Sequence, residues 1–169
     1  MELLQLVLKA LGETLYMVLI STAMAYLLGL PLGIVLVVTD RDGLRPNPAL
    51  YRVLGTIVNI LRSAPFIILM LALIPITRFI VGTSVGSSAA IVPLVIAAAP
   101  FVARLVESSL REVDHGVIEA SLSMGASVLQ TVGVMLREAL PSLITGAAIA
   151  ITTILGYSTM AGFVGGGGR

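Results

Sequence analysis

The stretch MVLISTAMAYLLGLPLGIVLVV, residues 17–38, decides the fold class. It lies within residues 14–39, which carry no formal charge, and a helix of about 20 apolar residues is enough to cross the hydrocarbon core of a bilayer. Ala-Met-Ala at 23–25 resembles a signal-peptidase site, but the apolar run continues to Val38 and no basic segment precedes it. The stretch therefore predicts a membrane-spanning helix that stays in the protein.

The rest of the chain has the same character. Of its 169 residues, 57% are hydrophobic and only 11% are charged, too few to cover the surface of a soluble domain. The absence of cysteine excludes a disulfide framework, a thiolate metal site and a cysteine nucleophile. The single histidine, His115, excludes a multi-histidine metal site. We therefore expect an integral membrane protein with no metal or nucleic-acid site. We expect no catalytic residues, because no Ser-His or carboxylate pair lies at membrane depth, so an enzyme is the weakest interpretation.

Outward from this first helix, the sequence predicts one domain over 1–169 with approximate spans 14–39, 63–81, 88–106 and 142–163. The second span is the least regular, because Arg62 and Arg78 are close together. Arginine at the bilayer centre costs about 2.5–3.5 kcal/mol, so both should lie near an interface. The sequence GTSVGSS at 82–88 supplies a turn before the third span. The fold class is all-α.

The arginines orient these spans. The gaps at 40–62 and 104–137 together hold seven of the ten basic residues. Because basic residues accumulate on the cytoplasmic side, both gaps should be cytoplasmic and the N-terminus should lie outside. No ionisable residue falls in the middle of a span, which disfavours a proton-relay transporter.

Two features inside the first span allow two interpretations. Gly29 and Gly33 form a small-xxx-small pair that suits close packing against another helix. Alternatively, Pro31 kinks the helix and the glycines only relieve the strain.

The polar gap contains VIEASLSMGAS, residues 117–127, which predicts a helix, a sharp turn and a second helix. Gly125 is placed to leave the first helix in a left-handed conformation, which favours glycine. Ser127 and Gln130 form a Ser-x-x-Gln capping box for the second helix. A short, slim helix of this kind suits a groove on a partner protein. The alternative, an interfacial helix on lipid, usually has a strongly basic face, and this helix has none.

These residues also carry a resemblance. EASLSMG at 119–125, followed by EALPSL at 138–143, resembles the cytoplasmic loop of ABC importer permeases, in which Glu-Ala-Ala-x-x-x-Gly precedes Leu-Pro. Ser121 stands at the third position of this motif, in place of its second alanine, and Leu136-Arg137 stands where the family usually has a further Leu-Pro. Other stretches are similar to the methionine (D-/L-methionine) permeases of that family: NILRSAPFIILM (59–70), IVGTSVG (80–86), AAIVPL (89–94), AAAPFVAR (97–104) and GYSTMAGFVGGGG (156–168).

The resemblance implies a type I ABC importer permease of the bacterial cytoplasmic (inner) membrane, with four of an expected five spans present. It implies a homodimer in the lipid bilayer, a cytoplasmic ABC ATPase and an extracytoplasmic substrate-binding protein. ATP and Mg²⁺ would bind to the ATPase, and this chain would hold no cofactor. Methionine would cross by alternating access. The alternatives are another small amino acid or a peptide as substrate, or a membrane scaffold that recruits a cytosolic partner without transport.

The candidate site residues fall into two groups. Within a cytoplasmic coupling segment at about 107–137, the residues expected to contact the ATPase are Asp114, Glu119, Ala120, Ser121, Gly125, Ala126 and Ser127. Polar residues of the spans are candidates for lining the substrate path, with hydrogen bonding between helices as the alternative: Asn59, Ser63, Thr152, Thr153, Tyr157 and Ser158.

Overall fold

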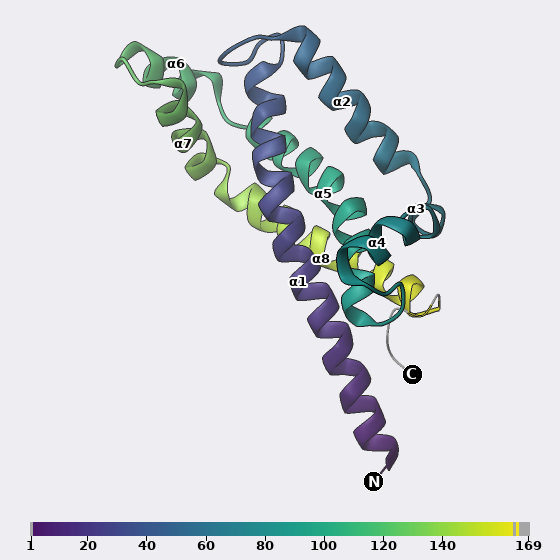
Figure 1. Cartoon of the computed structure of the whole chain (residues 1–169). Coiled ribbons are helices and arrows are strands. Elements are labelled where there is room, and N and C mark those ends of the chain that lie inside the picture. The colour runs from purple at the N-terminus through teal and green to yellow at the C-terminus, as the bar shows by residue number, and fades with distance from the viewer. Residues whose placement is uncertain (1, 164, 166–169) are drawn as a thin grey trace.

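The computed structural model describes residues 2–163 and 165, and these residues form eight helices joined by short connections (Figure 1). The last glycines of the 156–168 stretch lie outside the described residues. In chain order the helices are α1 Glu2–Thr39, α2 Pro48–Ser63, α3 Phe66–Ala72, α4 Ile74–Val81, α5 Ser87–Arg111, α6 His115–Ser123, α7 Val128–Glu138 and α8 Leu140–Phe163.

Three of the described helices are long and apolar enough to cross a bilayer, namely α1, α5 and α8 as far as Gly162. A fourth crossing is available if α2 and α3, which bend by 104° at their junction, are counted as one broken span. This helical architecture agrees with the predicted fold class.

The segment predicted as the second span, 63–81, is not one helix. Ala64 precedes a proline and is extended, with φ −73° and ψ 130°, because the proline ring disfavours the helical conformation of the residue before it. A second interruption at Leu73 separates α3 from α4 and lies two residues before Pro75, which has no backbone N–H to donate. The prolines therefore divide this apolar segment into α3, α4 and the end of α2.

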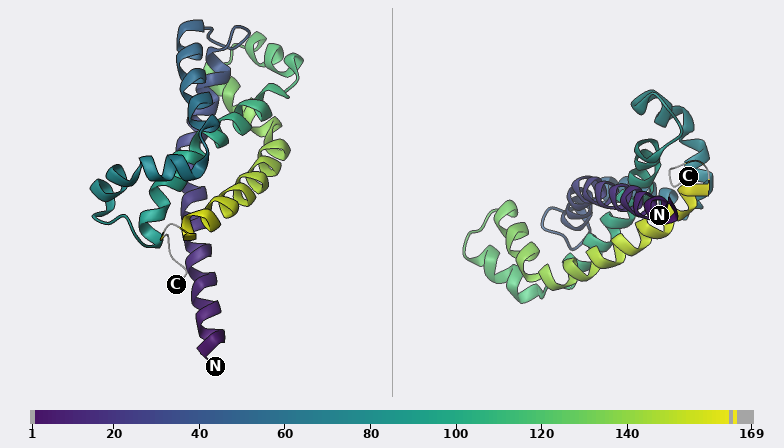
Figure 2. Two further views of the ribbon diagram at one scale, coloured as in Figure 1. Left: turned by 90° about the vertical axis from the view of Figure 1, so that its right-hand side faces the viewer. Right: turned by 90° about the horizontal axis from the view of Figure 1, so that it is seen from below.

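The first helix begins twelve residues before the predicted start at 14 (residue 2 against residue 14). Its first buried side chain is Met17, and the N-terminal part projects beyond the other helices (Figure 2). Because no neighbouring helix covers this part, its leucines remain exposed, including Leu3 at 74%. Only the C-terminal part of α1 belongs to the packed core.

The core is built where α1 lies against α5. A Cβ added to Gly29 would meet the carbonyl oxygen of Ala99 at 2.7 Å, and one added to Gly33 would meet that of Ala103 at 2.6 Å. Both distances are shorter than real Cβ contacts, so only glycine permits this approach. Of the two interpretations of these glycines, close packing is therefore correct, and α1 continues through Pro31 as one helix.

The other end of the core joins α3, α5 and α8. The ring of Phe66 stacks on that of Tyr157, with centroids 4.7 Å apart and an interplanar angle of 6°. Met70, Leu94 and Ala161 are buried in the same cluster. Between α4 and α5, Gly82 and Gly86 both have positive φ, as the turn predicted at 82–88 requires.

Candidate functional site

The α6–turn–α7 segment lies at one end of the molecule, the same end as the connection between α1 and α2 (Figure 1). It connects α5 to α8 through very short links. Only three residues, Glu112–Asp114, separate α5 from α6, and only Ala139 separates α7 from α8. A displacement of this segment would therefore be applied directly to two helices that are long enough to cross a membrane.

The turn has the predicted chemistry. Gly125 has φ +81°, and the N–H groups of Gly125 and Ala126 donate to the carbonyls of Leu122 and Ser121 at 2.9 and 3.2 Å. These two bonds form a Schellman motif, which ends α6. Ser127 and Gln130 then make the predicted capping box, with the Ser127 N–H donating to Gln130 Oε1 at 2.8 Å. Hydrogen bonds fix the backbone on both sides of the turn, so the segment should be rigid. We refer to α6, the turn and α7 (residues 115–138) as the hook.

Two of the candidate coupling residues have roles inside the hook. Asp114 is the N-cap of α6, and its Oδ1 accepts the Gly116 N–H at 2.7 Å. Ser121 is buried, and its Oγ lies 3.3 Å from Oγ1 of Thr131 on α7. Because this hydroxyl pair holds α6 against α7, an alanine at 121 would remove a contact that this sequence uses.

The outer surface of the hook is apolar at its tip. Met124 is 83% exposed and Leu129 is 84% exposed, on either side of Gly125. The candidate residues Glu119, Ala120 and Ser127 are also exposed, and Ala126 is half-buried. Two large apolar side chains exposed on a hydrogen-bonded turn make this tip a candidate contact surface.

Sequence reasoning missed a buried charged cluster at the end of α5. Glu107 is only 4% exposed, yet its carboxylate pairs with Arg104 and with Arg111. The Arg111 Nη2 to Glu107 Oε1 distance is 2.7 Å, and the hydroxyl of Tyr51 donates to the same oxygen at 3.1 Å. A buried carboxylate needs such compensation. The spacing Arg-x-x-Glu-x-x-x-Arg on a helix was the available signal.

This charged cluster ties three helices together. Arg111 also pairs with Asp40 just after α1, at 2.8 Å. Arg104 Nη2 donates to the carbonyl of Gly55 at 3.1 Å and to Asn59 Oδ1 at 2.9 Å, both on α2. The polar contacts of α5 therefore hold the end of α1 and two turns of α2 in place.

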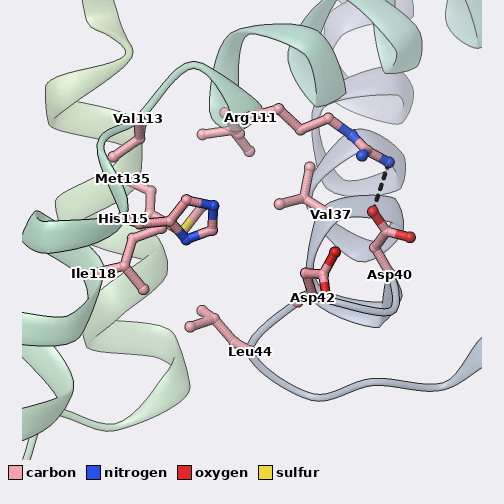
Figure 3. Close-up of a pocket in the computed structure, with 11 residues that line it drawn as sticks. Val37, Asp40, Asp42, Leu44, Arg111, Val113, His115, Ile118 and Met135 are labelled. Atoms are coloured by element: carbon pink, nitrogen blue, oxygen red, sulfur yellow. Dashed lines mark ion pairs between the residues drawn. The ribbon is translucent and has the colours of Figure 1, made fainter.

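A cavity of about 190 Å³ lies beside this cluster, between the end of α1, the end of α5 and the hook. His115, Ile118 and Met135 line one wall, and Asp40, Asp42 and Arg111 lie opposite (Figure 3). Among the described residues there is no group of three or more His, Asp or Glu side chains that could hold a metal ion.

The candidates for the substrate path are not brought together as one polar surface. Thr152 and Thr153 donate to the carbonyls of Ala148 and Ile149 in their own helix, at 2.8 and 2.9 Å. Ser158 is 3% exposed and donates to Leu155, and Ser63 donates to Ile60. These hydroxyls are thus satisfied within their own helices, not between helices. The Asn59 side chain accepts a hydrogen bond from Arg104, and the Tyr157 ring stacks on that of Phe66.

The comparisons with known proteins agree with one another. Residues 11–169 match the family model described as binding-protein-dependent transport system inner membrane component. A probable D-methionine transport system permease protein MetI of Vibrio cholerae is 54% identical over 164 residues, which cover 96% of this chain and 73% of that protein. The D-methionine transport system permease protein MetI of Escherichia coli K12 is 50% identical over 158 residues, 93% of this chain and 73% of that protein.

Solved structures give the same result. A chain in an inward-facing structure of the MetNI methionine ABC transporter is 50% identical, with a TM-score of 0.95 over 96% of this chain and 76% of that chain. An amino acid ABC transporter solved with histidines has a TM-score of 0.76 at 19% identity, covering 97% of this chain and 74% of that chain, and this shows a shared fold. The chain therefore belongs to the family of inner-membrane components of binding-protein-dependent transport systems.

Proposed function

We propose that this chain is the permease subunit of an ATP-driven importer that carries methionine across the cytoplasmic membrane. Its similarity to permeases named for D-methionine, at 54% and 50% identity, supports the substrate. The likeness to a chain of the MetNI methionine ABC transporter supports a homodimer that works with a separate ATPase. ATP and Mg²⁺ would bind to that ATPase, and an extracytoplasmic binding protein would deliver the substrate.

The observation that carries the mechanism is the rigid hook with its exposed apolar tip. Met124 and Leu129 give a partner an apolar contact surface. The hydrogen bonds of the Schellman motif and the capping box would keep the turn from deforming when the partner moves it. Glu119 supplies a polar contact beside this tip. When the ATPase closes on ATP, the hook would move with it as a rigid body.

The displacement would then pass to the helices through covalent and polar connections. The hook continues directly into α5 and α8, so both would tilt. The Glu107 cluster ties α2 and the end of α1 to α5, so these would follow. Such a movement would alternate the access of a mostly uncharged path between the two sides of the membrane.

The test is ATP-dependent uptake of labelled methionine into proteoliposomes. The permease would be reconstituted with its cognate ATPase and binding protein, with unlabelled amino acids as competitors. Inhibition by methionine alone would support the proposal. Inhibition by another solute would keep the mechanism and reject the substrate. A stable complex with the ATPase but no ATP-dependent uptake would indicate a scaffold.

A pair of matched variants tests the hook. A Cβ at Gly125 meets nothing within 4 Å, and aspartate tolerates positive φ better than most residues. Gly125→Asp should therefore strain the turn without a steric clash, place a charge on the proposed contact surface and abolish uptake. Gly82→Asp is the control, because Gly82 has the same φ of +81° and the same open space at the far end of the molecule. Normal uptake by Gly125→Asp would contradict the coupling role.

A further inference from the structure

A second open cavity, of about 250 Å³, lies where the connection after α1 meets the first turn of α2. It is separate from the cavity in Figure 3 except that both have Asp40 in their walls. Its lining residues are Asp40, Arg41, Pro48, Tyr51 and Arg52. Neither the fold nor the proposed transport mechanism assigns a role to this cavity.

The cavity favours an anion. Arg41 and Arg52 are exposed, and neither guanidinium makes an ion pair or hydrogen bond within the part of the chain that the structure describes. The only carboxylate in the wall, Asp40, is already occupied. Its Oδ2 pairs with Arg111 at 2.8 Å and its Oδ1 accepts the Arg41 N–H at 2.8 Å. Two arginines without a partner and one already paired carboxylate therefore line the cavity, and guanidinium binds phosphate with paired hydrogen bonds.

The same helix also offers an apolar surface. Leu50, Val53, Ile57 and Ile60 are 39%, 57%, 49% and 62% exposed, and their spacing puts them on one face of α2, away from the side that packs on α5. Gly55 and Val58 mark that packed side. A soluble phosphate would leave the apolar stripe in water, whereas a phospholipid would cover it with acyl chains. The combination of free arginines at the start of α2 and an apolar stripe on another face of the same helix favours a lipid.

We propose that this cavity, with Arg41 and Arg52, binds the phosphate headgroup of an anionic phospholipid whose acyl chains cover the exposed face of α2. A lipid bound there would fill the angle between α1 and α2. Tyr51, which lines the cavity and also donates to Glu107, would connect the lipid to the charged cluster of α5.

The test is native mass spectrometry of the full chain in detergent with equal amounts of phosphatidylglycerol and phosphatidylcholine. The unmodified chain should retain phosphatidylglycerol preferentially. An arginine near anionic headgroups contributes about 1 kcal/mol, so Arg41→Gln with Arg52→Gln should lower the preference roughly fivefold per arginine. The control is Lys9→Gln with Arg78→Gln, which removes the same charge from α1 and α4 and should leave the preference unchanged.

A fold control and the outcomes that would overturn the proposal complete the experiment. Unchanged helical circular dichroism of the Arg41/Arg52 variant would show that its loss of lipid is not a loss of fold. Undiminished preference in that variant, or an equal loss in the control, would overturn the proposal. Displacement of phosphatidylglycerol by millimolar inorganic phosphate would also overturn it, because the cavity would then be a site for a soluble anion.

Discussion

Glu107→Gln should destabilise the protein more than any other single charge removal on α5. The substitution keeps the size of the side chain and removes the charge that compensates two arginines. Arg111 keeps Asp40 at 2.8 Å, but the guanidinium of Arg104, whose side chain is only 20% exposed, keeps no carboxylate. Loss of one partner of a buried ion pair costs about 3–5 kcal/mol. Because Arg111 reaches water, we expect the lower end, about 3 kcal/mol.

The assay is unfolding by sodium dodecyl sulfate in mixed micelles, followed by circular dichroism at 222 nm. Glu112→Gln is the control, because Glu112 is the C-cap residue of α5 and is exposed. It should change the free energy of unfolding by less than about 0.5 kcal/mol. Equal effects of the two substitutions would refute the assignment of Glu107 as the compensated centre of the cluster.

Amide exchange adds a local readout for the same substitution. The polar contacts between α2 and α5 pass through Tyr51, Gly55 and Asn59, whereas α1 is held on α5 by close packing at Gly29 and Gly33. Glu107→Gln should therefore accelerate exchange in α2 and leave the glycine-packed part of α1 nearly unchanged. Uniform acceleration in both helices would mean that the cluster supports the whole fold and not the attachment of α2.

Further predictions address packing, capping and orientation. Gly33→Val should cost at least about 2 kcal/mol in the same unfolding assay, because its Cβ meets backbone of α5, whereas Gly12→Val meets nothing within 4 Å and should be neutral. Ser127→Ala removes the N-cap of α7 and should cost about 1 kcal/mol while reducing uptake. In intact cells, an impermeant maleimide should label Thr83→Cys from outside and Ser123→Cys only after permeabilisation. The natural chain contains no cysteine to interfere.

Local chemistry explains which parts of the site were predictable. The left-handed Gly125 and the Ser127–Gln130 box depend on residues within one turn of each other, so the sequence pattern is sufficient. The break of 63–81 at Pro65 and Pro75 was also local, but the hydrophobic pattern outweighed the prolines in the prediction. Prolines that divide an apolar run deserve the greater weight.

The rest depends on contacts between distant residues. Arg104 is hydrogen-bonded to Gly55, 49 residues away in the sequence, and Arg111 to Tyr51, 60 residues away. No periodicity within α5 predicts either partner. Ser121 is buried because it packs against Thr131 on α7. Which face of α6 is buried therefore depends on the position of α7 and could not be predicted from α6 alone. A pattern of alternating charges on one helix could have suggested the Glu107 pairs, but not the attachment of α2.

Helix α5 makes two kinds of contact, close glycine packing with α1 and arginine hydrogen bonds with α2, which should allow different amounts of relative movement. Close packing at Gly29 and Gly33 involves backbone atoms that cannot shift without losing contact, so α1 and α5 should move as one unit. The attachment of α2 uses long arginine side chains, which can keep their hydrogen bonds while the helix tilts. A displacement of the hook would then move α1 together with α5, whereas α2 could change its tilt relative to α5. Gly33→Val should therefore impair uptake in proportion to lost stability, whereas Arg104→Lys should impair uptake with little loss of stability.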